Sequence, residues 1–154
     1  KNKFMIIRRG VKEDIPQTLE LIKELAEYEN ALDEVSNTKE VLEKDGFGED
    51  PVFDLFIAEK NKKIIGIALT FFRYSTWKGK VLYLEDLIVS KLYRRQGAGK
   101  KLFDEVTKFA KAKSCVGLSL QVLDWNEIGI NFYKKYNMKF DEEWVNCYME
   151  FDEK

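Results

Sequence analysis

The pattern of apolar and polar positions is clearest between Tyr83 and Phe109, where it predicts a strand, a loop and a helix. Residues 83–89 are apolar apart from Glu85 and Asp86, as in a buried strand. A basic loop that ends in Gly97-Ala98-Gly99 follows this strand. Beyond the loop, apolar residues recur at the spacing of an amphipathic helix, at Leu102, Phe103, Val106, Phe109 and Ala110.

The rest of the chain shows the same two patterns. Helices are expected to begin near Asp14, Thr38 and Asn126, because these residue types are favourable helix N-caps. Strands are expected at residues 4–8, 53–59, 64–74, 81–89, 117–123 and 144–151. Three strands follow one another in the middle of the chain without a helix between them, which predicts an antiparallel meander. The sequence therefore predicts an α+β fold and a single domain over residues 1–154.

Composition excludes several classes of function. The 26 basic and 27 acidic residues nearly cancel, so nothing in the overall charge favours nucleic acid or an anionic membrane. No apolar run approaches the length of a membrane span. Two cysteines are too few for a disulfide framework and predict a cytoplasmic location. The absence of histidine removes His-based catalytic triads and most metal sites, so we expect no metal, and acid–base chemistry falls to other side chains.

The glycine-rich loop predicts a phosphate-binding site, because backbone N–H groups at a helix N-terminus attract anions. A P-loop would need glycine at position 94 and Ser or Thr at position 101, where the chain has Arg94 and Lys101. The dinucleotide-binding pattern would need a third glycine where Leu102 stands. What remains is Arg94-x-x-Gly97-x-Gly99. The alternative is an ordinary glycine-rich turn before a helix.

This Arg-x-x-Gly-x-Gly pattern resembles the pyrophosphate-binding motif of the GNAT acyl-CoA N-acyltransferase superfamily. Further segments resemble its diamine (spermidine/spermine) and thialysine N-acetyltransferase branch, in the same order and at matching intervals: FMIIR, LIKELAEYE, KDGFGEDP, YSTWKGK, LYLEDLIV, YRRQGAGKKL, VLDWN and INFYK. The resemblance covers nearly the whole chain. It implies a GNAT fold with α/β/α-type layering, in which helices flank a mixed, mostly antiparallel central sheet of about six or seven strands.

The resemblance also implies that the chain uses acetyl-CoA as a co-substrate. The backbone of Leu87, Ile88 and Val89 would face the pantetheine arm. The pyrophosphate would lie at the loop formed by Arg94, Arg95, Gln96, Gly97, Ala98, Gly99 and Lys100. A second segment would line the cofactor through Asn126, Glu127, Ile128, Gly129 and Tyr133.

Two catalytic roles follow from the same resemblance. Tyr133 matches the tyrosine that protonates the departing CoA thiolate, and Glu85 matches the carboxylate that handles the amine, as its base through a water. Without the resemblance, Tyr133 would be interpreted as an aromatic residue on the core face of its helix. The chemistry of the acceptor supports a carboxylate independently, because an alkyl amine is mostly protonated at neutral pH and must lose a proton before it attacks a thioester.

Strand alternation assigns different environments to the two acids. If the strand is regular, Glu85 lies on one face with Tyr83, Leu87 and Val89, and Asp86 lies on the other. Burying an unpaired carboxylate is unfavourable, which favours a functional explanation for the pair. The alternative is that one or both acids form ion pairs with Lys or Arg.

The acceptor is expected to contact Tyr28, Glu29, Ser75, Thr76, Trp77, Glu85, Asp86 and Trp144. The polyamine branch has Asp-Pro before the turn tryptophan, whereas this chain has Ser75-Thr76 before Trp77, as in the thialysine branch. Thialysine carries its own carboxylate, which a pair of hydroxyls repels less than an aspartate would. Thialysine or a related amino acid is therefore favoured, while diamines and polyamines stay open as acceptors.

Two further classes stay open in principle. A non-catalytic acyl-CoA-binding module would share the glycine-rich loop but gives no reason for Glu85 and Tyr133 to coincide with family positions. A nucleic-acid-binding protein is disfavoured by the balanced charge, and a membrane partner is not expected. Family members are usually homodimers, so the resemblance implies a homodimer.

Overall fold

The computed structural model describes residues 4–152, in which nine helices and strands of four or more residues follow the predicted order. Their bounds are β1 (Met5–Arg9), α1 (Ile15–Tyr28), α2 (Lys39–Phe47), β2 (Asp54–Lys60), β3 (Lys63–Ser75), β4 (Gly79–Val89), α3 (Ala98–Ala112), β5 (Gly117–Leu120) and α4 (Glu127–Lys134). The chain divides into two compact units, one ending at Gln121 and one beginning at Val122. The expectation of one domain over residues 1–154 stays a prediction.

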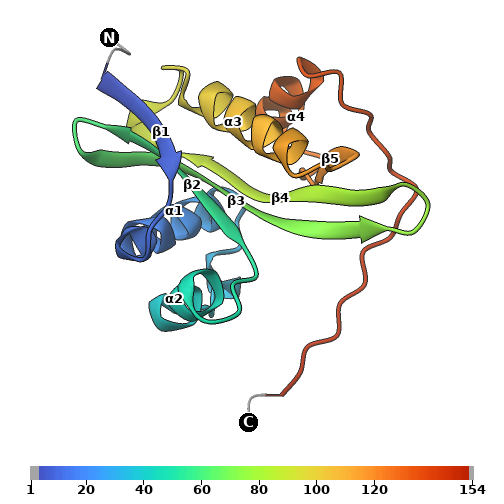
Figure 1. Cartoon of the computed structure of the whole chain (residues 1–154), viewed down its shortest axis with the longest axis horizontal. Coiled ribbons are helices and arrows are strands. Elements are labelled where there is room, and N and C mark those ends of the chain that lie inside the picture. Colours follow the sequence, from blue (N-terminus) through green and yellow to red (C-terminus); the bar gives the residue numbers. More distant parts are fainter. Residues whose placement is uncertain (1–3, 153–154) are drawn as a thin grey trace. The chain divides into compact units, whose positions relative to one another are not determined.

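The first unit is built on a five-stranded sheet in the order β1-β2-β3-β4-β5. The first four strands are antiparallel to their neighbours, and β5 pairs with β4 in parallel. Figure 1 shows α3 on one face of this sheet and α1 and α2 on the other. The predicted meander of β2, β3 and β4 and the α+β fold class are therefore confirmed.

The face under α1 and α2 is covered because both helices present an apolar side to it. Ile15 and Leu21 of α1 and Leu42 of α2 pack with Ile57 and Ile67 of the sheet in one buried cluster. Thr38 caps α2 by accepting a hydrogen bond from the Val41 N–H at 3.2 Å, as the sequence predicts.

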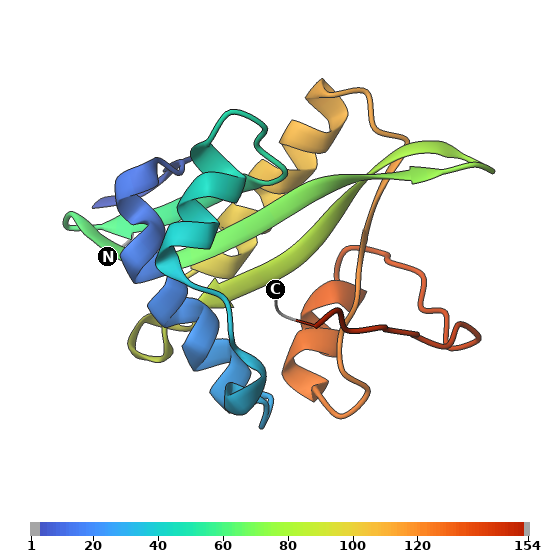
Figure 2. The ribbon, with the colours of Figure 1, turned by 90° about the horizontal axis from the view of Figure 1, so that it is seen from below.

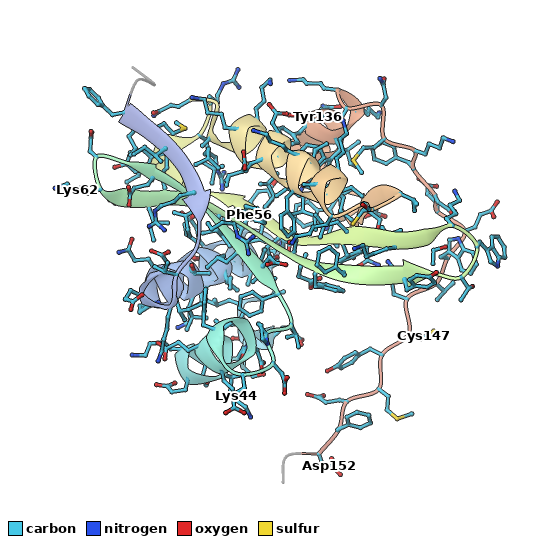
Figure 3. The ribbon with its side chains drawn as sticks, viewed as in Figure 1. Lys44, Phe56, Lys62, Tyr136, Cys147 and Asp152 are labelled. Atoms are coloured by element: carbon cyan, nitrogen blue, oxygen red, sulfur yellow. The ribbon has the colours of Figure 1, made fainter. Side chains whose placement is uncertain are left out.

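The opposite face is covered by α3, whose predicted apolar stripe is confirmed. Leu102 and Val106 are completely buried, which stabilises the fold by about 1.5–3 kcal/mol for each side chain. The Phe109 ring contacts the rings of Phe56 and Phe72, with centroids 5.2 and 5.9 Å apart. Figure 3 shows Phe56 within the sheet beneath α3. This packing fixes the position of the first turn of α3.

The second unit contains α4 and an extended C-terminal segment. A strand was expected at residues 144–151, but the structure assigns no strand between Met138 and Asp152, and β5 ends at Leu120 rather than at position 123. The described sheet therefore has five strands instead of the expected six or seven. The prediction of a strand at residues 144–151 was wrong because it used the apolar residues alone. A strand also needs a neighbouring strand that accepts and donates its backbone hydrogen bonds. Among the described residues, no helix is both long and apolar enough to cross a membrane.

Candidate active site

A β-bulge in β4 sets the positions of the two adjacent acids. Leu84 pairs with Thr70 of β3, but the next pair joins Asp86 to Leu69, so Glu85 is an extra residue in the ladder. Because paired residues share a face, Asp86 lies on the same face as Tyr83, which pairs with Phe71. The expectation that Asp86 points away from the face of Tyr83 is therefore wrong, since a bulge breaks strict alternation.

The face that Asp86 shares is the one covered by α1. Asp86 is half-buried, whereas Glu85 is exposed at the bulge. Burial raises the pKa of Asp86 to about 7, and repulsion from Glu85 and from Glu29 at the end of α1 adds to the effect. Burial likewise raises the pKa of Glu29 above its usual range. The carboxylates of Glu85 and Glu29 thus both act on Asp86 at the junction of β4 and α1.

No described basic residue forms an ion pair with Glu85 or Asp86. Burial, followed by repulsion from Glu85, raises the pKa of the Tyr83 hydroxyl, and the Arg73 guanidinium over its ring at 5.2 Å lowers it in part. The interpretation of both acids as structural ion-pair partners is therefore not supported among the residues that the structure describes. Such a cluster attracts a cation such as an ammonium group.

The edge of β4 next to these acids is open. β5 pairs with β4 only from Val81 to Leu84, and β4 continues to Val89 with no described strand on that side. The backbone of Leu87, Ile88 and Val89 pairs with β3 on one edge only, so its other edge offers backbone groups to a ligand, apart from the Val89 carbonyl, which accepts a hydrogen bond from Arg94. This arrangement fits the amides of a pantetheine arm.

The loop after β4 presents a helix N-terminus. Arg95 and Gly97 have positive φ angles of 63° and 90°, and Gly97 is the N-cap of α3 without a side-chain cap. The N–H groups of the first turn of a helix have no partner within the helix, and the helix dipole makes this end positive. In contrast, the N-termini of α2 and α4 are capped by the side chains of Thr38 and Asn126. The open end of α3 therefore fits a pyrophosphate.

Side chains hold this loop at several points. Arg94 donates from Nε to the Val89 carbonyl at 3.3 Å, and its guanidinium lies 5.8 Å from the centre of the Tyr28 ring. Ala98 is buried, and Lys100 pairs with Asp104 of α3 at 2.7 Å. The loop between β4 and α3 is thus connected both to the end of α1 and to its own helix.

The turn between β3 and β4 carries three predicted substrate residues. The Lys78 N–H donates to Ser75 Oγ at 3.1 Å, Thr76 follows in the turn, and Trp77 is 88% exposed. Six residues separate Ser75 from Leu69, the partner of Asp86, so the turn lies roughly 20 Å along the hairpin from that acid. Figure 2 shows this long hairpin reaching beyond α1 and α2. Within one chain these residues do not meet Asp86.

The second unit holds the other predicted cofactor residues. Asn126 Oδ1 accepts a hydrogen bond from the Gly129 N–H at 3.0 Å and caps α4, as expected. A Cβ at Gly129 would lie 2.8 Å from Asn126 Nδ2, so a larger residue there would displace the capping side chain. Glu127 and Ile128 fill the first turn, and the Tyr133 ring lies edge-on to Phe132 at 5.2 Å. The cofactor and catalytic roles assigned here stay predictions, as does that of Trp144, which is 76% exposed.

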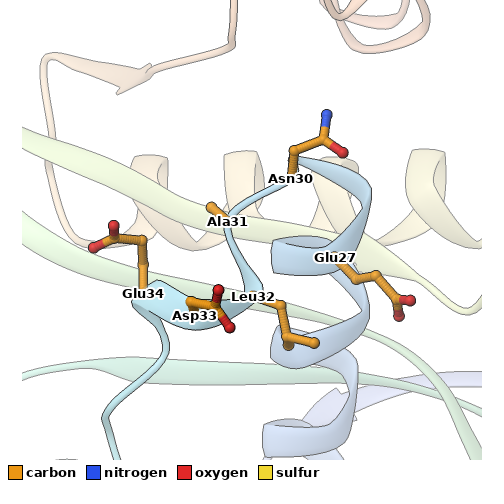
Figure 4. A pocket seen from close by; sticks show the side chains of 6 residues that line it. All are labelled: Glu27, Asn30, Ala31, Leu32, Asp33 and Glu34. Carbon is orange, nitrogen blue, oxygen red and sulfur yellow. The ribbon is translucent and has the colours of Figure 1, made fainter.

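A hollow of about 450 Å³ lies where α1 ends, next in sequence to Tyr28 and Glu29. Its lining residues are Glu27, Asn30, Ala31, Leu32, Asp33 and Glu34. Figure 4 shows the side chains of Glu27 and Glu34 pointing in opposite directions rather than toward one another. The convergent acids are therefore those on β4 and at Glu29, not those of the hollow.

Comparisons with known proteins agree with the geometry. Residues 18–138 match the family described as acetyltransferase (GNAT) family. Thialysine N-epsilon-acetyltransferase of Bos taurus is 42% identical over 85% of this chain and 82% of its own length. Spermidine/spermine N1-acetyltransferase-like protein 1 of Homo sapiens is 39% identical over 84% of this chain, but only 20% of its own length.

Structural similarity extends to more distant proteins. An aminoglycoside acetyltransferase from an uncultured soil metagenomic sample, solved in complex with trehalose, has a TM-score of 0.79. It covers 99% of this chain and 100% of its own at 23% identity, which shows a shared fold.

Proposed function

Since the chain belongs to the GNAT family of acetyltransferases, we propose that its acidic cluster binds the primary amine of thialysine or a closely related amino acid. The chain is an acetyl-CoA-dependent N-acetyltransferase. An acceptor with an ammonium group is favoured by one observation, the cluster of Asp86, Glu85 and Glu29, which forms no ion pair among the described residues. The relatives named thialysine N-epsilon-acetyltransferase and the neutral pair Ser75-Thr76 favour an acceptor with its own carboxylate.

The two acids on β4 have different tasks in this proposal. Asp86, with a pKa near 7, exchanges a proton with the acceptor at neutral pH, which is the requirement for a general base. Glu85, exposed at the bulge, attracts the ammonium group, and the proton that the ammonium loses passes through a water to Asp86. The neutral amine then forms the new C–N bond.

The acetyl donor supplies a thioester carbon for this attack. The open edge of Leu87, Ile88 and Val89 supports the placement of the pantetheine arm, and the uncapped α3 N-terminus supports that of the pyrophosphate. We propose that the Tyr133 hydroxyl donates the proton that neutralises the departing thiolate. Transfer is direct, so neither Cys115 nor Cys147 carries the acetyl group, and both are free cysteines.

Three further proposals concern the location, the oligomeric state and the partners of the chain. Two free cysteines suit a reducing cytoplasm. We assign a homodimer, supported by the family resemblance and by the exposed apolar side chains of the C-terminal segment. No nucleic acid, membrane or metal takes part in the proposed reaction.

A polyamine is the second candidate acceptor, favoured by the human spermidine/spermine acetyltransferase-like relative and by the acidic residues at the end of α1. Several carboxylates along a groove would each attract one ammonium group of a polyamine.

Thiol release from acetyl-CoA, measured with thialysine, lysine, ornithine, putrescine and spermidine, separates these acceptors. We expect the highest kcat/KM with thialysine. A higher kcat/KM with spermidine or putrescine would establish the polyamine alternative, and turnover with none of the five would overturn both.

A further inference from the structure

We propose that Lys60, at the end of β2, is a positioning residue for the phosphate-binding loop and adds positive charge beside the CoA pyrophosphate. The inference rests on the proposed placement of the pyrophosphate at the N-terminus of α3. Lys60 lies 36 residues before the loop and belongs to none of the segments that the family resemblance singles out.

The contact that carries the inference joins Lys60 to Gln96. Lys60 Nζ donates a hydrogen bond to Gln96 Oε1 at 2.6 Å, and both side chains are half-buried. Gln96 stands between Arg95 and Gly97, which both have positive φ angles. A left-handed conformation is unfavourable for a residue with a Cβ such as Arg95, so it persists only where the surroundings hold it. The bond to Lys60 fixes the loop at this point.

The charge of Lys60 is not neutralised by this contact. Its partner is a neutral amide oxygen, and Lys60 takes part in none of the ion pairs among described residues. The adjacent Glu59 contacts Arg8 instead, at 3.3 Å. A half-buried ammonium is screened less by salt than an exposed one, so it adds attraction for an anion at the loop.

A second contact ties the same hairpin to the same loop. Asn61 and Lys62 both have positive φ angles, as in a tight two-residue hairpin turn. The turn brings Lys63 next to Lys60 across the hairpin, and Lys63 Nζ lies 5.4 Å from the centre of the Tyr93 ring. The β2–β3 hairpin therefore supports the loop at both Tyr93 and Gln96.

The test compares two thioesters in the full-length enzyme. Acetyl-CoA carries the pyrophosphate, whereas S-acetylpantetheine lacks it. Lys60→Met keeps the unbranched apolar part of the side chain and removes its charge and donor. We expect the KM for acetyl-CoA to rise about fivefold to tenfold, within the range for the loss of one hydrogen bond, with kcat within twofold. Reaction with S-acetylpantetheine should be unchanged.

Three further variants make the test specific. Lys62→Asn removes a neighbouring charge at a position whose left-handed φ suits asparagine, and Figure 3 shows Lys62 at the tip of the turn. It should leave both reactions unchanged. Lys60→Arg should restore most of the affinity for acetyl-CoA. Gln96→Ala should raise the KM as Lys60→Met does, and the double variant should be no worse than either single one.

The outcomes separate this inference from the placement on which it rests. Equal loss with both thioesters, or additive effects of Lys60→Met and Gln96→Ala, would overturn the role of Lys60. An unchanged KM in Lys60→Met would do the same. If the wild-type enzyme bound CoA and pantetheine equally well by calorimetry, the pyrophosphate placement itself would be wrong.

Discussion

At the scale of single residues, Asp86 is the acid whose position on β4 gives it an unusual pKa. The bulge at Glu85 turns the Asp86 side chain toward the face under α1, where burial and two further carboxylates raise its pKa to about 7. Both its neutral and its charged form are therefore present at neutral pH in the folded protein without a ligand. A bound ammonium group favours the charged form, because an opposite charge stabilises the carboxylate.

The first prediction concerns stability. The pKa of Asp86 is raised from 3.8 in the unfolded chain to about 7 in the folded one, so the folded state binds more protons between these values. At low pH Asp86 is protonated in both states and does not destabilise the fold. The free energy of unfolding then decreases as the pH rises toward 7, because the buried side chain must lose its proton. Asp86→Asn should therefore raise the melting temperature at pH 8 and change it little at pH 4. Asp50→Asn, in an exposed loop, is the control and should do neither.

The second prediction concerns the pH dependence of activity. Glu29 raises the pKa of Asp86 through repulsion, so Glu29→Gln should lower that pKa and move the acidic limb of the kcat/KM profile to lower pH. Glu27→Gln changes a carboxylate on the same helix that does not contribute to the Asp86 pKa. An acidic limb that stays in place in Glu29→Gln, or moves equally in Glu27→Gln, would contradict the role of Asp86 as the base.

The third prediction concerns Tyr133. If its hydroxyl protonates the thiolate, Tyr133→Phe should lower kcat about a hundredfold, within the range of general acid catalysis, with the KM for acetyl-CoA within twofold. Tyr136→Phe on the same stretch of chain is the matched control. Equal kcat values in Tyr133→Phe and wild type would show that another group donates the proton.

At the scale of elements, the junction of β4 and α3 organises the proposed cofactor site. β4 continues past the end of β5 and leaves a backbone edge open, and α3 begins at a glycine without a side-chain cap. The apolar stripe of α3, anchored by Leu102 and Val106, holds its first turn against the sheet. A rigid helix N-terminus keeps its N–H groups oriented before the anion arrives, which lowers the entropic cost of binding.

The fourth prediction tests this N-terminus. Gly97 has a φ of 90°, a conformation that an alanine adopts at a cost of about 1–2 kcal/mol. Gly97→Ala should therefore distort the loop and raise the KM for acetyl-CoA about tenfold, since 1.4 kcal/mol corresponds to a factor of ten. Gly117→Ala is the control, because its added Cβ meets nothing within 4 Å. Steady-state kinetics with both variants decides the outcome.

At the scale of the whole molecule, the C-terminal segment between positions 144 and 151 forms no helix or strand. Trp144, Val145, Tyr148, Met149 and Phe151 are between 76% and 90% exposed. Exposed apolar side chains in such a run mark an interaction surface, and a second copy of the chain is the partner that the family resemblance implies.

The fifth prediction follows from this exposure. Sedimentation velocity should show a dimer, and Val145→Asp with Tyr148→Asp should shift it toward a monomer by placing unpaired charges in the interface. Glu142→Lys with Glu150→Lys changes the charge of the same segment without removing an apolar side chain. A wild-type chain that sediments as a monomer at all concentrations would contradict the homodimer.

The sequence by itself determined the helices, the central meander and the family. Local signals suffice for these: the stripe of α3, the caps at Thr38 and Asn126, and the loop from Arg94 to Gly99 each depend on residues close together in the chain. The residue types also predict carboxylates at the acceptor site, because the chain has no histidine for amine chemistry, and this assignment stays a prediction.

Only the tertiary structure decided which acid faces α1, how the loop is held and where strands end. The bulge at Glu85 appears in the register with β3, the bond from Lys60 to Gln96 spans 36 residues, and the repulsion between Glu29 and Asp86 crosses from a helix to a strand. The apolar residues between positions 144 and 151 predict a strand, yet the structure assigns none there. These features depend on residues distant in sequence, and no local pattern encodes such contacts.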